Sequence, residues 1–325
     1  MPDPVLVTGA GGFIGSHLVD LLLETGHEVR AFVHYNSSGR PGWLERDEVN
    51  GRIDLEAGDV RDLDGVNRAM EGCRSVFHLA ALIGIPYSYR SPLAYVRTNI
   101  EGTYNVLEAA RRLGVNKVVV TSTSETYGTA QYVPIDEDHP SRAQSPYAAT
   151  KVGADQLARS YHCSFDLPVW IVRPFNTFGP RQSARAFIPS VIAQIQCGRG
   201  HVKVGSLEPT RDLTYVRDTV AGMLAVAGCE PLMGSVTNIG TGREVSMGTV
   251  LEQIAALMGV EVRIQAETER VRPDASEVMR LVCDNGRLRE HTGWTPQWDL
   301  DAGLEATIRW MARQPHVIAP ERYHI

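Results

Sequence analysis

The sequence predicts an α/β protein with a large, doubly wound parallel sheet and a smaller, discontinuous C-terminal lobe. Three observations support this prediction: short apolar strands alternate with amphipathic helices from the N-terminus, a glycine-rich loop joins the first strand to the first helix, and the alternation weakens after about Phe175. Such alternation is typical of a parallel sheet that helices cover on both faces. We therefore expect residues 1–175 to form the sheet domain, with returning segments near 215–242, and residues 176–325 to form most of the second lobe.

The elements follow from apolar runs of two lengths. Short runs bounded by glycine or polar residues predict strands, in chain order at Pro4–Thr8, Glu28–His34, Arg52–Ala57, Ser75–Leu79, Lys117–Ser122, Val169–Arg173 and Val236–Ile239. Longer amphipathic runs predict helices at Phe13 to about Glu24, Tyr95–Leu113, Tyr147–Phe165, Ala186–Cys197, Asp218–Ala227, Met247–Leu257 and Leu304–Arg313. This order suits a parallel sheet, because a helix returns the chain to the start of each strand.

The composition excludes several classes of protein. The chain has 325 residues, 43% of them hydrophobic, and can bury a sizeable core. A net charge of −6 argues against a broad nucleic-acid surface. The sequence has neither an apolar run long enough to span a membrane nor a secretion signal, so we expect a cytoplasmic protein. The five cysteines lie far apart without a C-x-x-C pair, and predict neither a disulfide framework nor a metal site.

The glycine-rich loop after the first strand predicts dinucleotide binding. Gly9 permits a tight turn, Gly12 lets the backbone approach a pyrophosphate, and Gly15 allows the helix to pack closely on the strand. Phe13 and Ile14 open the following helix, whose N-terminus favours negative charge. A glycine-rich loop between a strand and a helix is typical of a Rossmann fold, and we predict that fold here.

The residues expected at the adenosine end leave the choice between NAD and NADP open. A Rossmann fold that selects NAD usually ends its second strand in an acidic residue, which binds the ribose 2′-hydroxyl, but here that strand ends in His34. His34 and Arg40 could accommodate a 2′-phosphate or could be solvated loop residues. Asp59 and Val60, after the third strand, are further candidates for an adenosine contact.

Tyr147 and Lys151 form the predicted catalytic pair. Ser145 and Pro146 are typical of a helix start, which places Tyr147 and Lys151 four residues apart on one helix face. A nearby ammonium and a bound cationic nicotinamide would both lower the pKa of the phenol from about 10 towards neutrality, so that Tyr147 could act as a general base.

Together these motifs resemble the extended short-chain dehydrogenase/reductase family, whose members act mainly on nucleotide-activated sugars. The matching positions are the Gly9 loop, Asp59-Val60, His78-Leu79-Ala80-Ala81, Asn99, Thr121–Gly128, Tyr147 with Lys151, and Arg173–Asn176. The resemblance implies a tightly bound NAD or NADP that Leu79, Ala80 and Ala81 help to hold. It also implies that Asn99 supports the catalytic lysine through a backbone or water contact, and that Asn176 and Arg211 face the diphosphate of the substrate.

Thr123, Ser124 and Glu125 indicate which reaction follows the oxidation of C4. Family members that only invert C4 commonly have small residues at the positions of Ser124 and Glu125. A carboxylate here could remove the acidic C5 proton beside a C4 ketone while water leaves from C6. Return of hydride to C6 and of a proton to C5 would give a 4-keto-6-deoxy sugar, with the cofactor recycled within the turnover. Glu125 could instead be a solvated loop carboxylate.

The triplet Thr123-Ser124-Glu125 resembles that of GDP-mannose 4,6-dehydratases, whereas dTDP-glucose dehydratases carry Thr-Asp-Glu. Glu125, Ser124 or a water would then protonate the leaving C6 hydroxyl. Thr-Ser-Glu also occurs in UDP-glucuronate decarboxylases, which are the principal alternative, and a 4-epimerase is another. A non-catalytic dinucleotide-binding protein is a remote alternative, because neither the Tyr147–Lys151 pair nor the carboxylate is lost.

Four longer segments resemble bacterial 4,6-dehydratases of the legionaminic acid pathway, thought to act on GDP-N-acetylglucosamine. They span residues 85–89, 179–186, 209–212 and 272–278. We therefore expect a GDP- or UDP-N-acetylhexosamine as substrate, with Tyr87, Asn176, Arg185, Arg211 and Arg272 contacting it. The family also implies a homodimer that packs through the helices Tyr95–Leu113 and Tyr147–Phe165.

Overall fold

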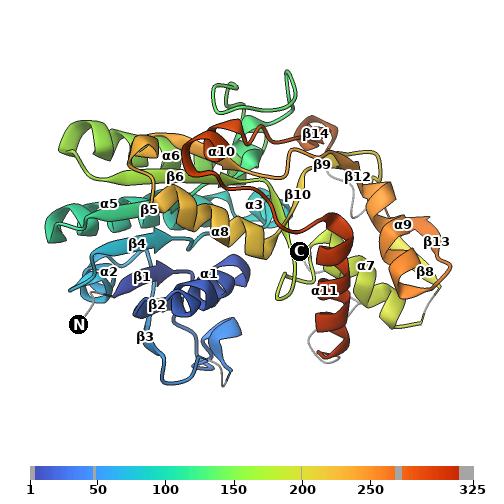
Figure 1. The fold of residues 1–325 in the computed structure, drawn as a ribbon, viewed down its shortest axis with the longest axis horizontal. Helices are drawn as coiled ribbons and strands as arrows, with labels where there is room; N and C mark the ends of the chain where they lie inside the picture. The colour runs from blue at the N-terminus through green and yellow to red at the C-terminus, as the bar shows by residue number, and fades with distance from the viewer. Residues whose placement is uncertain (1–3, 47–48, 199, 268–272, 315–325) are drawn as a thin grey trace.

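The computed structural model describes residues 4–46, 49–198, 200–267 and 273–314, which form a parallel sheet with helices on both faces and a second lobe beside it (Figure 1). The sheet has seven strands in the order β11-β6-β5-β4-β1-β2-β3. In chain order these are β1 (Val5–Thr8), β2 (Val29–His34), β3 (Ile53–Gly58), β4 (Ser75–His78), β5 (Lys117–Thr121), β6 (Val169–Pro174) and β11 (Val236–Ile239). The predicted fold class, a doubly wound Rossmann sheet with a smaller lobe, is confirmed.

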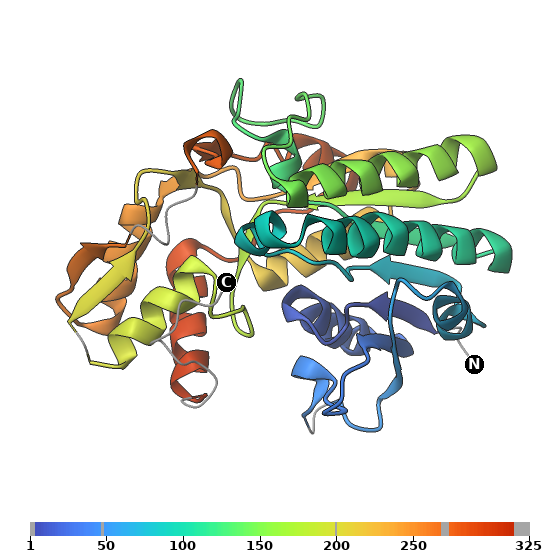
Figure 2. The same ribbon diagram turned by 180° about the vertical axis from the view of Figure 1, so that it is seen from behind.

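Alternate residues of each strand point to opposite faces, and each face has its own apolar core. Val5 and Val7 of β1 pack with α1 (Phe13–Glu24), α8 (Val216–Ala227) and α10 (Gly286–Thr292). Leu6, between them, packs on the other face with α2 (Leu63–Met70), α5 (Gly102–Leu113) and α6 (Pro146–Phe165). Figure 2 shows this second face, with α5 and α6 in front of the sheet.

The strand order reverses between β1 and β4, which creates the switch point at which doubly wound sheets bind ligands. β1 pairs with β2 on one side and with β4 on the other, and Thr8 lies opposite His78 in that register. The glycine loop after β1 therefore lies beside the loop after β4. The loop after β5, which carries Glu125, follows on the next strand.

The second lobe lies to the right of the sheet in Figure 1. Its core lies between α7 (Phe187–Gln196), α9 (Met247–Met258), α11 (Leu300–Ala312) and β8 (His201–Val204). β8 pairs in parallel with β13 (Arg263–Ala266), whose residues are exposed. Two small sheets complete the fold: β7 (Asn176–Phe178) with β10 (Leu213–Tyr215), and β9 (Thr210–Arg211) with β12 (Val245–Ser246) and β14 (Arg280–Leu281).

The predicted elements match the structure within a few residues, with one internal difference. The helix predicted at Tyr95–Leu113 consists of α4 (Pro92–Tyr95), a π-helical turn at Val96–Glu101 (η2) and α5. A π turn holds one extra residue, and such turns occur often at functional sites. Short elements were missed, among them α2, α3 (Ile85–Arg90), α10 and the small strands of the second lobe.

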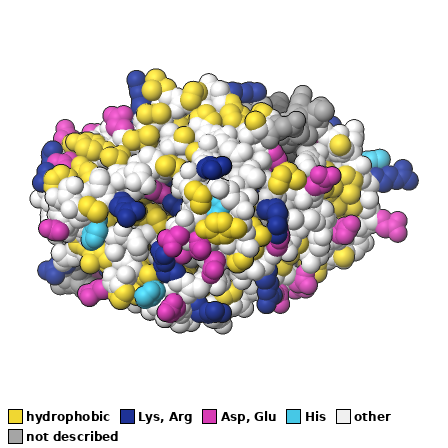
Figure 3. All heavy atoms as spheres, turned by 90° about the horizontal axis from the view of Figure 1, so that it is seen from above, with side chains coloured by type: hydrophobic (Ala, Val, Ile, Leu, Met, Phe, Trp, Pro, Cys, Tyr) yellow, Lys and Arg dark blue, Asp and Glu magenta, His cyan; other side chains and the backbone are white. Residues whose placement is uncertain are grey.

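Within the described residues, no helix is both long and apolar enough to cross a membrane. On the face of the molecule seen in Figure 3, acidic and basic side chains are interspersed over the surface.

Candidate active site

The glycine loop has the geometry that a dinucleotide pyrophosphate requires. Gly9 has a φ of +69°, and a Cβ there would come within 2.8 Å of the Ala80 nitrogen. A Cβ on Gly15 would lie 2.2 Å from the Gly9 carbonyl oxygen, so Gly15 lets the first turn of α1 lie directly against the loop that follows β1. Gly12 caps α1 without a side-chain hydrogen bond, which leaves the backbone N–H groups of the first turn, at Phe13 and Ile14, available to an anion. These residues fit the predicted cofactor.

A buried chain of hydrogen bonds connects this loop to the π turn. Thr8 Oγ1 lies 2.8 Å from His78 Nδ1, and His78 Nε2 lies 3.1 Å from Thr103 Oγ1. Thr103 donates its hydroxyl proton to the Asn99 carbonyl, so His78 must donate from Nε2 and accept at Nδ1. Burial and the charge of Lys151 lower the pKa of His78 to about 3, which agrees with a neutral ring. We call these four residues, Thr8, His78, Thr103 and Asn99, the neutral network.

Asn99 is bonded to the second turn of α6. Its Oδ1 accepts from the Leu82 nitrogen at 2.8 Å, and its Nδ2 donates to Thr150 Oγ1 at 3.0 Å. Thr150 directly precedes Lys151, so Asn99 holds α6 at that point. Lys151 itself donates from Nζ to the Thr121 carbonyl at 2.6 Å. A direct role of Asn99 at Lys151 stays a prediction.

Tyr147 and Lys151 lie together in the first turns of α6, as the sequence predicts. Ser145 Oγ accepts from the Ala148 nitrogen at 3.1 Å and caps the helix. Both side chains are buried, and the ring of Tyr147 lies 6.3 Å from that of Tyr95, centroid to centroid. The pair is therefore held in a site largely screened from solvent.

Burial dominates the electrostatics of Tyr147 in the protein alone. Burial raises the pKa of the phenol above its ordinary value, and the charges of Glu125 and Asp155 raise it further, while a hydrogen bond with Thr123 lowers it. Burial also lowers the pKa of Lys151, and Asp155 opposes that effect. The prediction that Lys151 and a bound nicotinamide together lower the pKa of Tyr147 concerns the protein with its cofactor. In the protein alone, burial is the largest influence on that pKa and raises it.

The loop after β5 brings Glu125 to the same place. Thr123 caps the short helix η3 (Ser124–Tyr127), and its Oγ1 accepts from the Glu125 nitrogen at 3.3 Å. Thr123 also bonds with Tyr147, and the Glu125 carboxylate is close enough to act on the pKa of that phenol. Ser124, which lies between Thr123 and Glu125 in the sequence, is buried. The predicted catalytic residues Thr123, Ser124, Glu125, Tyr147 and Lys151 thus converge on one site.

Tyr95 is a site residue that the sequence analysis missed. Its side chain is 1% exposed, and its hydroxyl donates to the Gly84 carbonyl at 2.5 Å. The half-exposed ring of Tyr87 lies 6.2 Å from that of Tyr95, so Tyr87, Tyr95 and Tyr147 form an aromatic row from the surface to the phenol that is predicted to be catalytic. Nothing in the local sequence distinguishes Tyr95 from a core tyrosine.

The residues predicted to contact substrate differ in how available they are. Asn176 Oδ1 is buried and has no hydrogen-bond partner among the described residues, so it can accept from a ligand. Arg185 is exposed, and its guanidinium lies next to Gly84. Arg211 is buried, and its guanidinium bonds to Glu277 at 3.3 Å and to the Thr210 carbonyl. Arg272 lies outside the described residues.

The residues predicted at the adenosine end lie together at the ends of β2 and β3. His34 Nδ1 is 3.9 Å from Asp59 Oδ2, and the same carboxylate binds the guanidinium of Arg61. Val60 is buried, while Leu79, Ala80 and Ala81 are half-buried beside Gly9. β2 ends in His34, so this strand carries no carboxylate that would select NAD over NADP.

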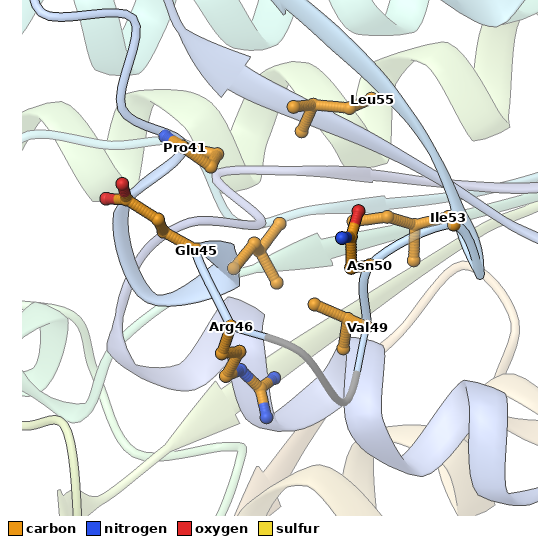
Figure 4. A pocket seen from close by; sticks show the side chains of 9 residues that line it. Pro41, Glu45, Arg46, Val49, Asn50, Ile53 and Leu55 are labelled. Carbon is orange, nitrogen blue, oxygen red and sulfur yellow. The ribbon is translucent and has the colours of Figure 1, made fainter.

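A separate surface cavity of about 390 Å³ lies between η1 (Gly42–Leu44) and β3 (Figure 4). It is lined by Pro41, Leu44, Glu45, Arg46, Val49, Asn50, Gly51, Ile53 and Leu55. None of the predicted catalytic residues borders it, so the cavity is not assigned to the reaction. Across the described residues no cluster of His, Cys, Asp and Glu could hold a metal ion.

A glycine loop at the switch point of a Rossmann sheet, together with Tyr147 and Lys151 on the adjoining helix, defines an enzyme of the extended short-chain dehydrogenase/reductase class. Residues 6–307 match the family model described as GDP-mannose 4,6 dehydratase. The chain therefore belongs to that family.

Relatives cover nearly the whole chain. A dTDP-glucose 4,6-dehydratase of Streptomyces griseus is 36% identical, over 95% of this chain and 94% of that protein. A UDP-glucose 4-epimerase of Mycolicibacterium smegmatis is also 36% identical, over 94% of this chain and 97% of that protein. DesIV, a dTDP-glucose 4,6-dehydratase of Streptomyces venezuelae solved with NAD and TYD bound, superposes with a TM-score of 0.87 at 29% identity, covering 95% of this chain and 97% of that one.

Proposed function

We propose that the chain is a nucleotide-sugar 4,6-dehydratase that acts on a GDP- or UDP-N-acetylhexosamine. The observation that carries this proposal is the carboxylate of Glu125, which lies close enough to Tyr147 to raise the pKa of that phenol. Inversion at C4 alone requires no second base, whereas elimination across C5 and C6 does.

The proposed catalytic residues act at two places on the sugar: Tyr147 at C4, and Glu125 at C5 and C6. A bound nicotinamide supplies the chemistry of hydride acceptance and return. Tyr147 takes the proton of the C4 hydroxyl, and the resulting C4 ketone makes the C5 hydrogen acidic. Glu125 removes that proton, and the C6 hydroxyl leaves as water after protonation by Glu125, Ser124 or a water. Asn176 Oδ1 accepts a hydrogen bond from the substrate.

Incubation of the protein with GDP-N-acetylglucosamine and with UDP-N-acetylglucosamine, followed by mass spectrometry, tests the proposal. We expect the loss of one water from the sugar. Release of CO₂ from UDP-glucuronate would instead identify a decarboxylase, and an unchanged mass with inverted C4 coupling in NMR would identify an epimerase. Either result, without loss of water from any GDP- or UDP-hexose, would overturn the proposal.

Two variants separate the roles. Tyr147→Phe should abolish the transient reduction of the cofactor, whereas Glu125→Gln should retain that reduction and lose the elimination. Glu56→Gln, which changes an exposed carboxylate on the edge strand β3, is the matched control and should behave like the wild type. Full turnover by Glu125→Gln would show that another group removes the C5 proton.

The cofactor is proposed to be a tightly bound NAD or NADP. The NAD bound to DesIV supports NAD as the cofactor. By contrast, β2 ends in His34 and not in the carboxylate that usually selects NAD. Mass spectrometry of the dinucleotide released from the denatured, purified protein decides between them.

A homodimer through α5 and α6 is also proposed, because both helices carry large exposed apolar side chains. Tyr104 on α5 is 41% exposed and Phe165 at the end of α6 is 52% exposed. Light scattering after gel filtration should give twice the mass of one chain, and Phe165→Glu should reduce it.

A further inference from the structure

A buried ion pair lies directly behind the catalytic lysine. Arg173 Nη2 on β6 and Asp155 Oδ2 on α6 are 2.6 Å apart, with side-chain exposures of 6% and 3%. Ser122, which follows β5, donates its hydroxyl to the same Asp155 oxygen at 2.6 Å. We call Asp155, Arg173, Ser122 and Lys151 the charged cluster. It joins two neighbouring strands to the catalytic helix.

The cluster is continuous with the catalytic pair. Tyr147, Lys151 and Asp155 follow one another at intervals of four residues on α6 and therefore share a face. Lys151 donates to the carbonyl of Thr121, the residue before Ser122, so one strand end holds both the ammonium and the carboxylate. On the far side, the Arg173 guanidinium lies 4.5 Å from the centre of the Tyr127 ring in η3.

Only one oxygen of the Asp155 carboxylate is paired. Asp155 Oδ1 is buried and has no hydrogen-bond partner among the described residues, while Oδ2 takes both donors. A buried ion pair is a weak contributor to folding stability, since desolvation offsets its attraction. The Asp155 carboxylate nevertheless acts on other buried groups. Asp155 raises the pKa of Lys151 against the effect of burial and also raises the pKa of Tyr147.

We propose that Asp155 and Arg173 are positioning residues for the catalytic pair: together they fix Lys151 in its charged form and set the pH range over which Tyr147 can accept a proton. The proposal rests on the proposed catalytic role of Tyr147 and Lys151, but not on which sugar reaction follows. Neither residue is proposed to contact the reacting atoms; each acts through Lys151 and Tyr147.

Other side chains also face Tyr147 and Lys151, and they stay in place when the charge of Asp155 or Arg173 is removed. Glu125 of η3 and Tyr95 of α4 act on Tyr147, and His78 of β4 faces Lys151 as a neutral ring. Removal of the Asp155 charge leaves Arg173 without its counter-ion, so net positive charge is gained, and deprotonation of Tyr147 and of Lys151 becomes easier. Removal of the Arg173 charge leaves the carboxylate unopposed and has the reverse effect. The two variants must therefore shift titration in opposite directions.

The test is a pH titration of tyrosinate absorbance in the full-length protein loaded with NAD, with no sugar present. The signal of Tyr147 is the difference from the same measurement on Tyr147→Phe. We expect Asp155→Asn to lower the titration midpoint by roughly one pH unit and Arg173→Met to raise it by a similar amount. Asp155→Glu, which keeps the charge, should restore the wild-type midpoint in large part.

A merely structural role for the pair predicts a different result. Both substitutions would then lower stability and leave the midpoint where it is, or move it in the same direction, and either outcome overturns the proposal. If one of the single variants does not fold, Ser122→Ala decides, because it removes one hydrogen bond from the Asp155 carboxylate and should raise the midpoint; no rise contradicts the proposal. Since no sugar is present, failure of the dehydratase assay leaves this test unaffected.

Discussion

The sheet domain contains two buried clusters of polar side chains, one neutral and one charged. The neutral network links the glycine loop to the π turn through Thr8, His78 and Thr103. Both ring nitrogens of His78 and both threonine hydroxyls are paired in it. The charged cluster links two strand ends to the catalytic helix through Asp155 and Arg173, and it leaves Asp155 Oδ1 without a partner among the described residues.

The difference indicates two ways of supporting a site. A fully paired neutral network fixes the relative positions of its elements and adds no net charge. A partly paired ionic cluster fixes positions and also projects a field onto its neighbours. The neutral network lies beneath the loop proposed to receive a pyrophosphate, whereas the charged cluster lies beneath the two residues proposed to move a proton. Substitutions in the two groups should therefore have different signatures.

The largest expected effect is that of Asp155→Ala on folding stability. The substitution leaves the Arg173 guanidinium buried without a counter-ion, and we expect a loss of about 3–5 kcal/mol in chemical denaturation. The double variant Asp155→Leu with Arg173→Met removes both charges and should regain most of that loss. Glu244→Ala, which breaks the more exposed pair with Arg280, should cost much less, because solvent screens that pair. A loss for Asp155→Ala no larger than that of Glu244→Ala would show that Arg173 finds another partner.

Thr8→Val tests the neutral network with an almost isosteric change. Without the hydroxyl, His78 Nδ1 loses its donor, and the Ala80 nitrogen loses the oxygen that lies 3.2 Å away. Two unpaired buried groups should cost about 2 kcal/mol in a denaturation experiment. Thr8→Ser keeps the hydroxyl and serves as the control. Equal stability of the two variants would mean that the hydroxyl is not needed to pair these groups.

These two groups also show which parts of the site can be predicted from sequence. Tyr147 and Lys151 are four residues apart on one helix, and Gly9 has a conformation that few other residues adopt, so local rules identify them. Asp155 and Arg173 lie on different elements, and so do Thr8 and His78, 70 residues apart. Their pairing depends on the order of the strands, which no local pattern specifies.

The second lobe shows the same limit in the fold. Its long helices were predicted because their amphipathic periodicity extends over several turns. Its strands were missed, since elements such as β9 (Thr210–Arg211) and β12 (Val245–Ser246) are two residues long and too short to show a period. Their pairing comes from tertiary contacts, and it is these contacts that bury Arg211 beside Glu277.

The pH dependence of stability should distinguish the neutral network from the charged cluster. Burial lowers the pKa of His78 to about 3, so the unfolded chain binds a proton that the folded chain does not between that value and the ordinary 6.5. Stability is therefore lost as the pH falls below 6.5, by about 2 kcal/mol between pH 7 and pH 5 for this residue. Urea denaturation at both pH values should show that loss reduced in His78→Gln. His27→Gln, at an exposed position, should retain the wild-type dependence; an identical slope in both variants would refute the neutral ring.

The smallest expected effect is that of Ser145→Ala, which removes the cap of α6 and touches neither group. The Ala148 nitrogen loses the hydroxyl oxygen that accepts its hydrogen bond at 3.1 Å, and we expect a loss of about 1 kcal/mol in folding stability. Ser145→Asp, which can cap the helix again, should recover it. Because no charge changes in Ser145→Ala, the tyrosinate midpoint of Tyr147 should stay at the wild-type value, in contrast to Asp155→Asn. A shifted midpoint in Ser145→Ala would show that the position of the helix start, and not only the field of the charged cluster, sets the titration of Tyr147.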